Sequence, residues 1–188
     1  MKRDWNTKTF VAIGTLAALQ VVLNLPGAFA AQVIGMPVVA DILSVVVIGV
    51  MYPLVPLIIR RFGAATLWMT IVAVLALPLP IAAPAGFLPK IPYLIAWGFL
   101  ADLTFWLFRR SDKLASIVTS VVQVGLGGPI AVFLWTYLGA PQLAADLAKF
   151  VGWVSIIVAS LLGAGLGFLA YYIYGKIKNT AAIQRLQQ

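Results

Sequence analysis

Six long apolar runs, separated by short polar connections, constrain the fold of this chain more than any other feature of its sequence. Each run is close to the roughly 20 residues that an α-helix needs to cross the hydrocarbon core of a bilayer. Because lipid offers no hydrogen-bond partners, a crossing segment must pair its own backbone groups, as an α-helix does. The sequence therefore predicts an all-α integral membrane protein, a single domain over residues 1–188 built as a bundle of six transmembrane helices. The predicted spans are about 9–30, 38–59, 63–81, 91–108, 114–138 and 150–174.

The composition supports this class and excludes several kinds of chemistry. Hydrophobic residues make up 63% of the chain and charged residues 10%, whereas soluble domains carry roughly 25% charged residues. The chain has no Cys and no His, and all five of its acidic residues are Asp. Thiolate nucleophiles, disulfides and imidazole metal sites are therefore excluded. We expect no enzymatic activity, no metal site and no cofactor.

The distribution of basic residues predicts the orientation. With the N-terminus in the cytosol, eleven Lys and Arg residues fall on the cytosolic side, and only Lys90 and Lys149 fall outside. Cytosolic connections of membrane proteins carry this excess of Lys and Arg. The sequence predicts a multi-pass protein of the cell membrane with both termini cytosolic. The net charge of +8 does not indicate nucleic-acid binding, because the basic residues lie in short clusters between apolar runs.

The first 32 residues also resemble a secretory signal, since a basic start and an apolar run precede PGAFAAQ, where Ala28 and Ala30 have the spacing of a cleavage site. The apolar run from Thr9 to Leu25 is longer than the usual 7–15 residues of a signal core. We therefore expect this segment to be retained as the first span, while cleavage would leave five.

Several polar and aromatic residues lie at similar depth in the outer halves of different spans. Polar groups inside spans usually face a cavity or a partner helix, and a small-molecule site needs aromatic walls with a few directed polar groups. The alternative is that the aromatic residues form interfacial belts and that Lys90 extends to the headgroups. The predicted substrate-binding residues are Asn24, Asp41, Lys90, Trp97, Trp135 and Trp153. Lys90, Tyr93 and Trp97 have the i, i+3, i+7 spacing of one helix face.

Two further features of the fourth predicted span and its approach need an explanation. The connection 77–92 contains five prolines, which stiffen the backbone, and it is either a rigid connector or a lid or wall over the outer cavity. Asp102 lies inside the apolar run, and the interpretation we favour is an ion pair with Arg109, or with Arg60 or Arg61. The alternative is a role in proton relay.

Small residues at four-residue spacing predict close helix packing. In the sixth span, Ala159, Gly163 and Gly167 are expected to pack inside the bundle. In the first span, Gly14 and Ala18 form either an internal contact or a docking stripe for a partner subunit. In the fifth, GLGGP at 125–129 permits a bend.

The chain resembles the substrate-binding S component of energy-coupling factor (ECF) transporters. The resemblance covers about residues 8–178 and is carried by the size, the six runs, the basic inner turns, AIGTLAAL and GFLPKIPYLIAWGFLAD. It implies capture of a vitamin or similar micronutrient in an outward-facing pocket. It also implies docking, through A-x-x-x-A surfaces, onto a transmembrane coupling subunit with two cytosolic ATPases; here Gly14 replaces the first Ala. The absence of a phosphate-binding loop agrees with this role. The alternatives are a scaffold or assembly factor without a substrate, and a self-sufficient secondary carrier.

Overall fold

The computed structural model describes residues 5–35 and 38–187, and the side chains of residues 38–43 and 187 are outside this description. The described chain is all-α, as the sequence predicts. Its helices are α1 (Thr7–Ile34), α2 (Val38–Ile59), α3 (Ala64–Leu75), α4 (Lys90–Leu107), α5 (Asp112–Gly125), α6 (Gly127–Tyr137), α7 (Pro141–Ala148), α8 (Trp153–Ile177) and α9 (Ala181–Gln187).

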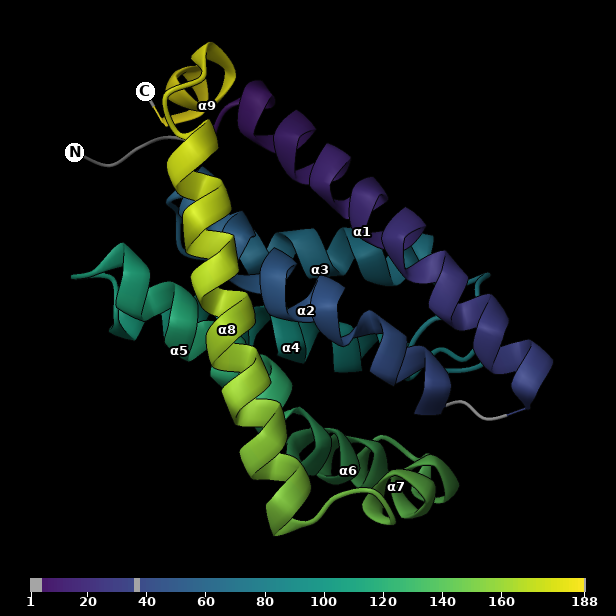
Figure 1. The fold of residues 1–188 in the computed structure, drawn as a ribbon. Coiled ribbons are helices and arrows are strands. Elements are labelled where there is room, and N and C mark those ends of the chain that lie inside the picture. The colour runs from purple at the N-terminus through teal and green to yellow at the C-terminus, as the bar shows by residue number, and fades with distance from the viewer. Residues whose placement is uncertain (1–4, 36–37, 188) are drawn as a thin grey trace.

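The two longest helices, α1 and α8, diverge from the end of the molecule where α9 and the start of α1 lie (Figure 1). Helices α2, α3 and α4 run between them, and α6 and α7 lie at the opposite end of α8 (Figure 1). The most extensive helix contacts are those of α5 with α8, α3 with α4 and α1 with α2. Trp68 and Val72 of α3 and Val55 and Leu57 of α2 are buried at the centre of this arrangement.

The predicted six spans are supported only in part. Within the described residues, α1 and α8 are long and apolar enough to cross a membrane, and α5 and α6 together make a third candidate that is bent by 56°. Helix α3 has 12 residues, which is roughly 18 Å at 1.5 Å per residue and too short for a core of about 30 Å. The structure thus shows two to three candidate spans.

The third predicted run is too long because its last residues do not continue the helix. Helix α3 ends at Leu75, and turns follow as far as Pro89. The Gly86 amide donates to the Leu77 carbonyl at 2.7 Å, which folds this connection back on itself. Prolines at 78, 80 and 84 lack the amide hydrogen that a helix would need at those positions.

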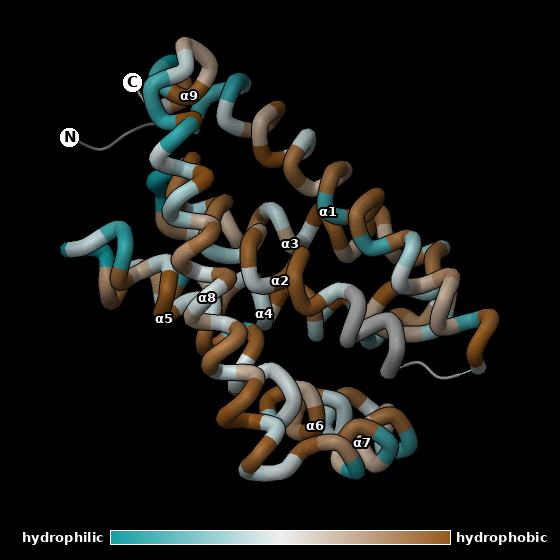
Figure 2. Tube along the Cα trace, viewed as in Figure 1, coloured by the Kyte–Doolittle hydropathy of each residue, from teal (hydrophilic) through white to brown (hydrophobic). Residues whose placement is uncertain are grey.

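The basic connections lie together at one end of the molecule, which we call the basic end. Arg60 donates to the Tyr174 hydroxyl at 3.2 Å and forms an ion pair with Asp112. The Arg61 guanidinium lies 5.7 Å from the centre of the Trp5 ring. These contacts join the N-terminus, the 60–63 turn, the start of α5 and the end of α8. Figure 2 shows hydrophilic segments there, so the 60–63 turn lies at the same end as Trp5, the start of α5 and the end of α8.

Asp102 has hydrogen-bond partners that differ from the predicted ion pair. Its carboxylate accepts hydrogen bonds from the Ala65 amide at 3.1 Å and from the Thr66 amide and hydroxyl at 2.7 Å. Helix α3 begins after Gly63, which has no side chain to cap the first amides. Asp102 therefore caps α3 from the neighbouring helix, and the favoured ion-pair interpretation missed this role.

The small residues of α8 pack against α5, as predicted. A Cβ atom added at Gly163 would lie 2.9 Å from the Ser120 carbonyl oxygen, and one at Gly167 would lie 2.7 Å from the Ile117 Cα. By contrast, a Cβ at Gly14 has no neighbour within 4 Å among the described residues, and Ala18 is exposed. The stripe on α1 is thus an outward-facing surface of the described fold.

Candidate functional site

The bend between α5 and α6 is the structural feature that positions the candidate site. Helix α5 ends at Gly125 and α6 begins at Gly127, with Leu126 between them. Pro129 falls in the first turn of α6, where its missing amide hydrogen costs no helical bond. An added Cβ at Gly127 would have the Trp97 ring at 3.9 Å. Irregular backbone at membrane depth is tolerated where protein or a cavity surrounds it.

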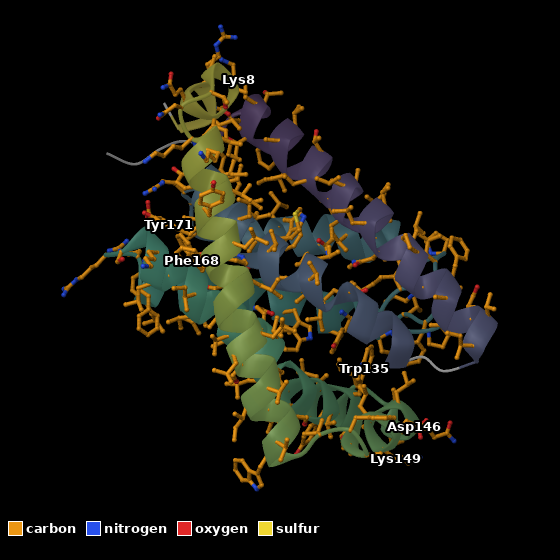
Figure 3. The ribbon with its side chains drawn as sticks, in the orientation of Figure 1. Lys8, Trp135, Asp146, Lys149, Phe168 and Tyr171 are labelled. Atoms are coloured by element: carbon orange, nitrogen blue, oxygen red, sulfur yellow. The ribbon has the colours of Figure 1, made fainter. Side chains whose placement is uncertain are left out.

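Four aromatic side chains pack beside this bend: Phe87, Tyr93, Trp97 and Trp135, which we call the aromatic cluster. Tyr93 stacks on Trp135 with ring centres 4.1 Å apart, and its ring meets Trp97 edge-on at 6.1 Å. Phe87 contacts the Trp135 ring at 5.8 Å. Figure 3 shows Trp135 on the side of α6 that faces the rest of the bundle. The cluster joins α4, α6 and the proline-rich connection.

Two buried polar atoms at the cluster have no hydrogen-bond partner among the described residues: the Trp97 Nε1 donor and the Gln123 Oε1 acceptor. The other end of the same amide is held, because Gln123 Nε2 donates to the Trp97 carbonyl at 3.2 Å. A buried polar group without a partner costs about 1–3 kcal/mol, so such groups are rare in folded proteins. The aromatic cluster therefore has one buried donor and one buried acceptor beside it that the described chain does not satisfy.

Lys90, one of the predicted substrate-binding residues, is buried and engaged by the chain itself. It is 0% exposed. Its ammonium donates to the carbonyls of Ala76, Leu79 and Ala83 at 3.1, 2.8 and 3.3 Å. An ammonium has three hydrogens, so these bonds use all of its donors. Lys90 therefore holds the proline-rich connection onto the start of α4, and the connection supplies Phe87 as a fixed wall of the aromatic cluster.

The remaining predicted residues do not join this site. Asn24 is buried on α1, which packs on α2 and α3, and its Oδ1 has no partner among the described residues. Trp153 is 83% exposed at the start of α8. Asp41 lies in the 38–43 stretch, outside the described side chains. Of the six predicted substrate-binding residues, the structure brings Trp97 and Trp135 together, on either side of Tyr93.

Sequence reasoning did not select Gln123 as a site residue. The available signal was its position, since Gln123 is the one carboxamide in the run 114–138 and it lies two residues before the first glycine of the GLGGP motif. A lone amide beside a helix break has free backbone groups within reach, as Gln123 has in the Trp97 carbonyl, whereas an amide in the middle of a regular span usually pairs with a neighbouring helix.

Comparison with known proteins identifies no relative of this chain: no family model, no curated protein and no solved structure matches it.

Proposed function

We propose that the chain is a membrane-embedded substrate-capture subunit of the ECF type, which binds a small molecule and relies on partner subunits for energy. The observation that carries this proposal is the pair of unpartnered buried atoms, Trp97 Nε1 and Gln123 Oε1, beside the aromatic cluster at the helix bend. Other buried atoms of the described chain also lack a partner, among them Gln20 Oε1 and Asn24 Oδ1, but Trp97 and Gln123 are joined by a hydrogen bond and lie beside the aromatic cluster.

The lining of this site favours a planar, partly apolar substrate. Tyr93, Trp97 and Trp135 already pack on one another by stacking and edge contacts, and the ring of a planar substrate would extend this packing. The substrate would accept a hydrogen bond from Trp97 and donate one to Gln123. The Lys90 ammonium is already bonded to three carbonyls of the proline-rich connection. The proposed substrate therefore needs no acidic group to pair with it. Vitamins with a heteroaromatic ring belong to this chemical class.

Energy would come from a transmembrane coupling subunit and two cytosolic ATPases, since the chain itself has no phosphate-binding loop. The stripe of Gly14 and Ala18 supports this arrangement, because Ala18 is exposed and a Cβ at the half-buried Gly14 would have no neighbour within 4 Å among the described residues. Small residues one turn apart leave a shallow surface on which a partner helix can approach closely. Of the two interpretations of this stripe, docking is therefore favoured over internal packing.

Replacing Gly14 or Ala18 with Trp is expected to abolish recovery of the coupling subunit and ATPases with tagged protein purified from native membranes. The bulky ring fills the docking surface, and since a Cβ at Gly14 has no neighbour within 4 Å among the described residues and Ala18 is exposed, we expect thermal stability to stay unchanged. Leu23→Trp is the matched control, because Leu23 is exposed on the opposite side of α1. Equal recovery from the Ala18→Trp and Leu23→Trp proteins would rule out docking through this stripe.

The bent span also favours a second candidate, a self-sufficient secondary carrier, since broken helices line the binding sites of such transporters. The same purification separates the two functions. If the wild-type protein copurifies with no ATPase or coupling subunit, and proteoliposomes containing it alone accumulate substrate along an ion gradient, the carrier replaces the capture subunit.

A further inference from the structure

A cavity of about 260 Å³ opens at the basic end, where α2 and α4 end and where α3 and α5 begin. Three arginines and two aspartates line it together with a mainly aromatic wall. The charged lining is Arg60, Arg61, Arg109, Asp102 and Asp112. Helix α4 runs from the aromatic cluster to this cavity, so the cavity is separate from the proposed capture site.

The charges of the cavity are suited to an anion. Asp102 accepts hydrogen bonds from the first turn of α3, and Asp112 is paired with Arg60. Both carboxylates are thus already engaged, and three guanidinium groups against two carboxylates leave a net positive lining. The Arg109 guanidinium lies over the Trp106 ring at 5.1 Å. Stacking uses the face of a guanidinium and leaves its N–H donors in the plane, in the geometry that binds phosphate.

Exposed aromatic rings continue from the cavity along α4. Phe62 meets Trp106 edge-on at 6.4 Å and Phe99 edge-on at 6.3 Å, and all three side chains are exposed. Phe99 and Trp106 are seven residues apart and lie on one face of α4. A free phosphate ion would make no contact with these exposed rings, whereas the acyl chain of a phospholipid would cover them and bury their apolar surface.

We propose that this cavity binds the phosphate headgroup of an anionic phospholipid. Arg61 and Arg109 contact the phosphate, and an acyl chain lies along Phe62, Trp106 and Phe99. The volume is just below the roughly 300–1,000 Å³ of sites that enclose a whole small ligand, which suits a headgroup whose chains stay in the bilayer. Basic pockets between helices at the cytosolic surface of membrane proteins bind headgroups of this class. The bound lipid would fasten the 60–63 and 108–111 turns to the membrane surface.

The test is native mass spectrometry of the full chain in detergent, with equal amounts of dioleoyl phosphatidylglycerol and dioleoyl phosphatidylcholine. We expect preferential retention of phosphatidylglycerol and a loss of about tenfold in the Arg109→Gln protein, since a charge-assisted hydrogen bond is removed. Arg110→Gln is the matched control, because it removes the same charge from the adjacent residue, which does not line the cavity. A second variant, Trp106→Leu, removes the ring under Arg109 and is expected to cost about threefold.

Three results would overturn the proposal. The first is equal retention of the two lipids by the wild-type protein. The second is an equal loss for Arg109→Gln and Arg110→Gln, which would mean general attraction of anions to the basic end. The third is displacement of phosphatidylglycerol by about 10 mM inorganic phosphate, which offers the same P–O⁻ acceptors to the arginines but has no acyl chain. That result would assign the cavity to free phosphate. The melting temperature of each variant is measured alongside, and all three variants are expected to unfold at the same temperature as the wild-type protein.

Discussion

Gly167→Leu is expected to break the contact between α5 and α8 and to lower the free energy of unfolding by about 3 kcal/mol, or roughly 10 °C in melting temperature. An added Cβ would lie 2.7 Å from both the Ile117 Cα and the Ser116 carbonyl oxygen, which are backbone atoms and cannot turn aside. The helices would separate, and the hydrogen bond from the Ser116 hydroxyl to the Gly167 carbonyl, now 2.7 Å long, would be lost.

The control for this change lies two residues away on the same helix. A Cβ at Gly165 has no neighbour within 4 Å among the described residues, and the position is exposed. Gly165→Leu adds the same atoms and should change the melting temperature by less than about 3 °C, since surface substitutions stay near ±0.5 kcal/mol. Thermal unfolding in detergent, followed by tryptophan fluorescence, measures both. Equal melting of the two variants would contradict the close α5–α8 packing.

Asp102→Ala is expected to cost about 3 kcal/mol because it leaves two amides and one hydroxyl at the start of α3 without their acceptor. It also removes a negative charge from the positive end of the helix dipole. Asp102→Asn keeps one oxygen acceptor and should lose less. Thr66→Val, which removes only the hydroxyl bond, should lose about 1 kcal/mol. Chemical denaturation of the three variants in mixed micelles gives the comparison.

This series also separates helix capping from the ion pair predicted from the sequence. If an arginine were the main partner of Asp102, then Arg109→Gln would destabilise the protein as much as Asp102→Ala does. Under capping, Arg109→Gln leaves stability unchanged, because the carboxylate is held by the amides of Ala65 and Thr66. A large loss in Arg109→Gln with none in Thr66→Val would contradict the capping assignment.

The sequence predicted features that depend on local pattern. Apolar runs of about 20 residues predicted the helices, because lipid leaves the backbone no other way to pair its polar groups. The spacing of Gly163 and Gly167 predicted the close approach that the structure shows. The glycines and proline at 125–129 predicted the bend that separates α5 from α6. Each of these features is determined within one segment of the chain.

Features that depend on which helices meet were harder to predict. Trp97, Trp135 and Trp153 have similar predicted depth, but depth does not tell which way a side chain faces. Trp153 projects outward from α8, while the other two pack on Tyr93.

The partners of Asp102 were missed for a related reason. Gly98, one turn before Asp102, lets α4 approach the start of α3 so closely that a Cβ there would lie 2.6 Å from the Ala65 carbonyl oxygen. Only that approach brings the uncapped amides within reach of the carboxylate.

The most direct test of substrate capture is native mass spectrometry of the protein purified from its host, compared with variants of the two unpartnered atoms. Trp97→Phe removes the indole N–H and keeps a ring, and Gln123→Leu removes the amide and keeps its approximate shape. Gln20→Leu is the control, since Gln20 is also buried with an unpartnered oxygen but lies on α1. We predict a small planar molecule bound to the wild-type and Gln20→Leu proteins, with occupancy reduced about tenfold in each of the other two, as expected for the loss of one buried hydrogen bond. Wild-type protein without a bound small molecule, or equal occupancy in all four proteins, would contradict the account.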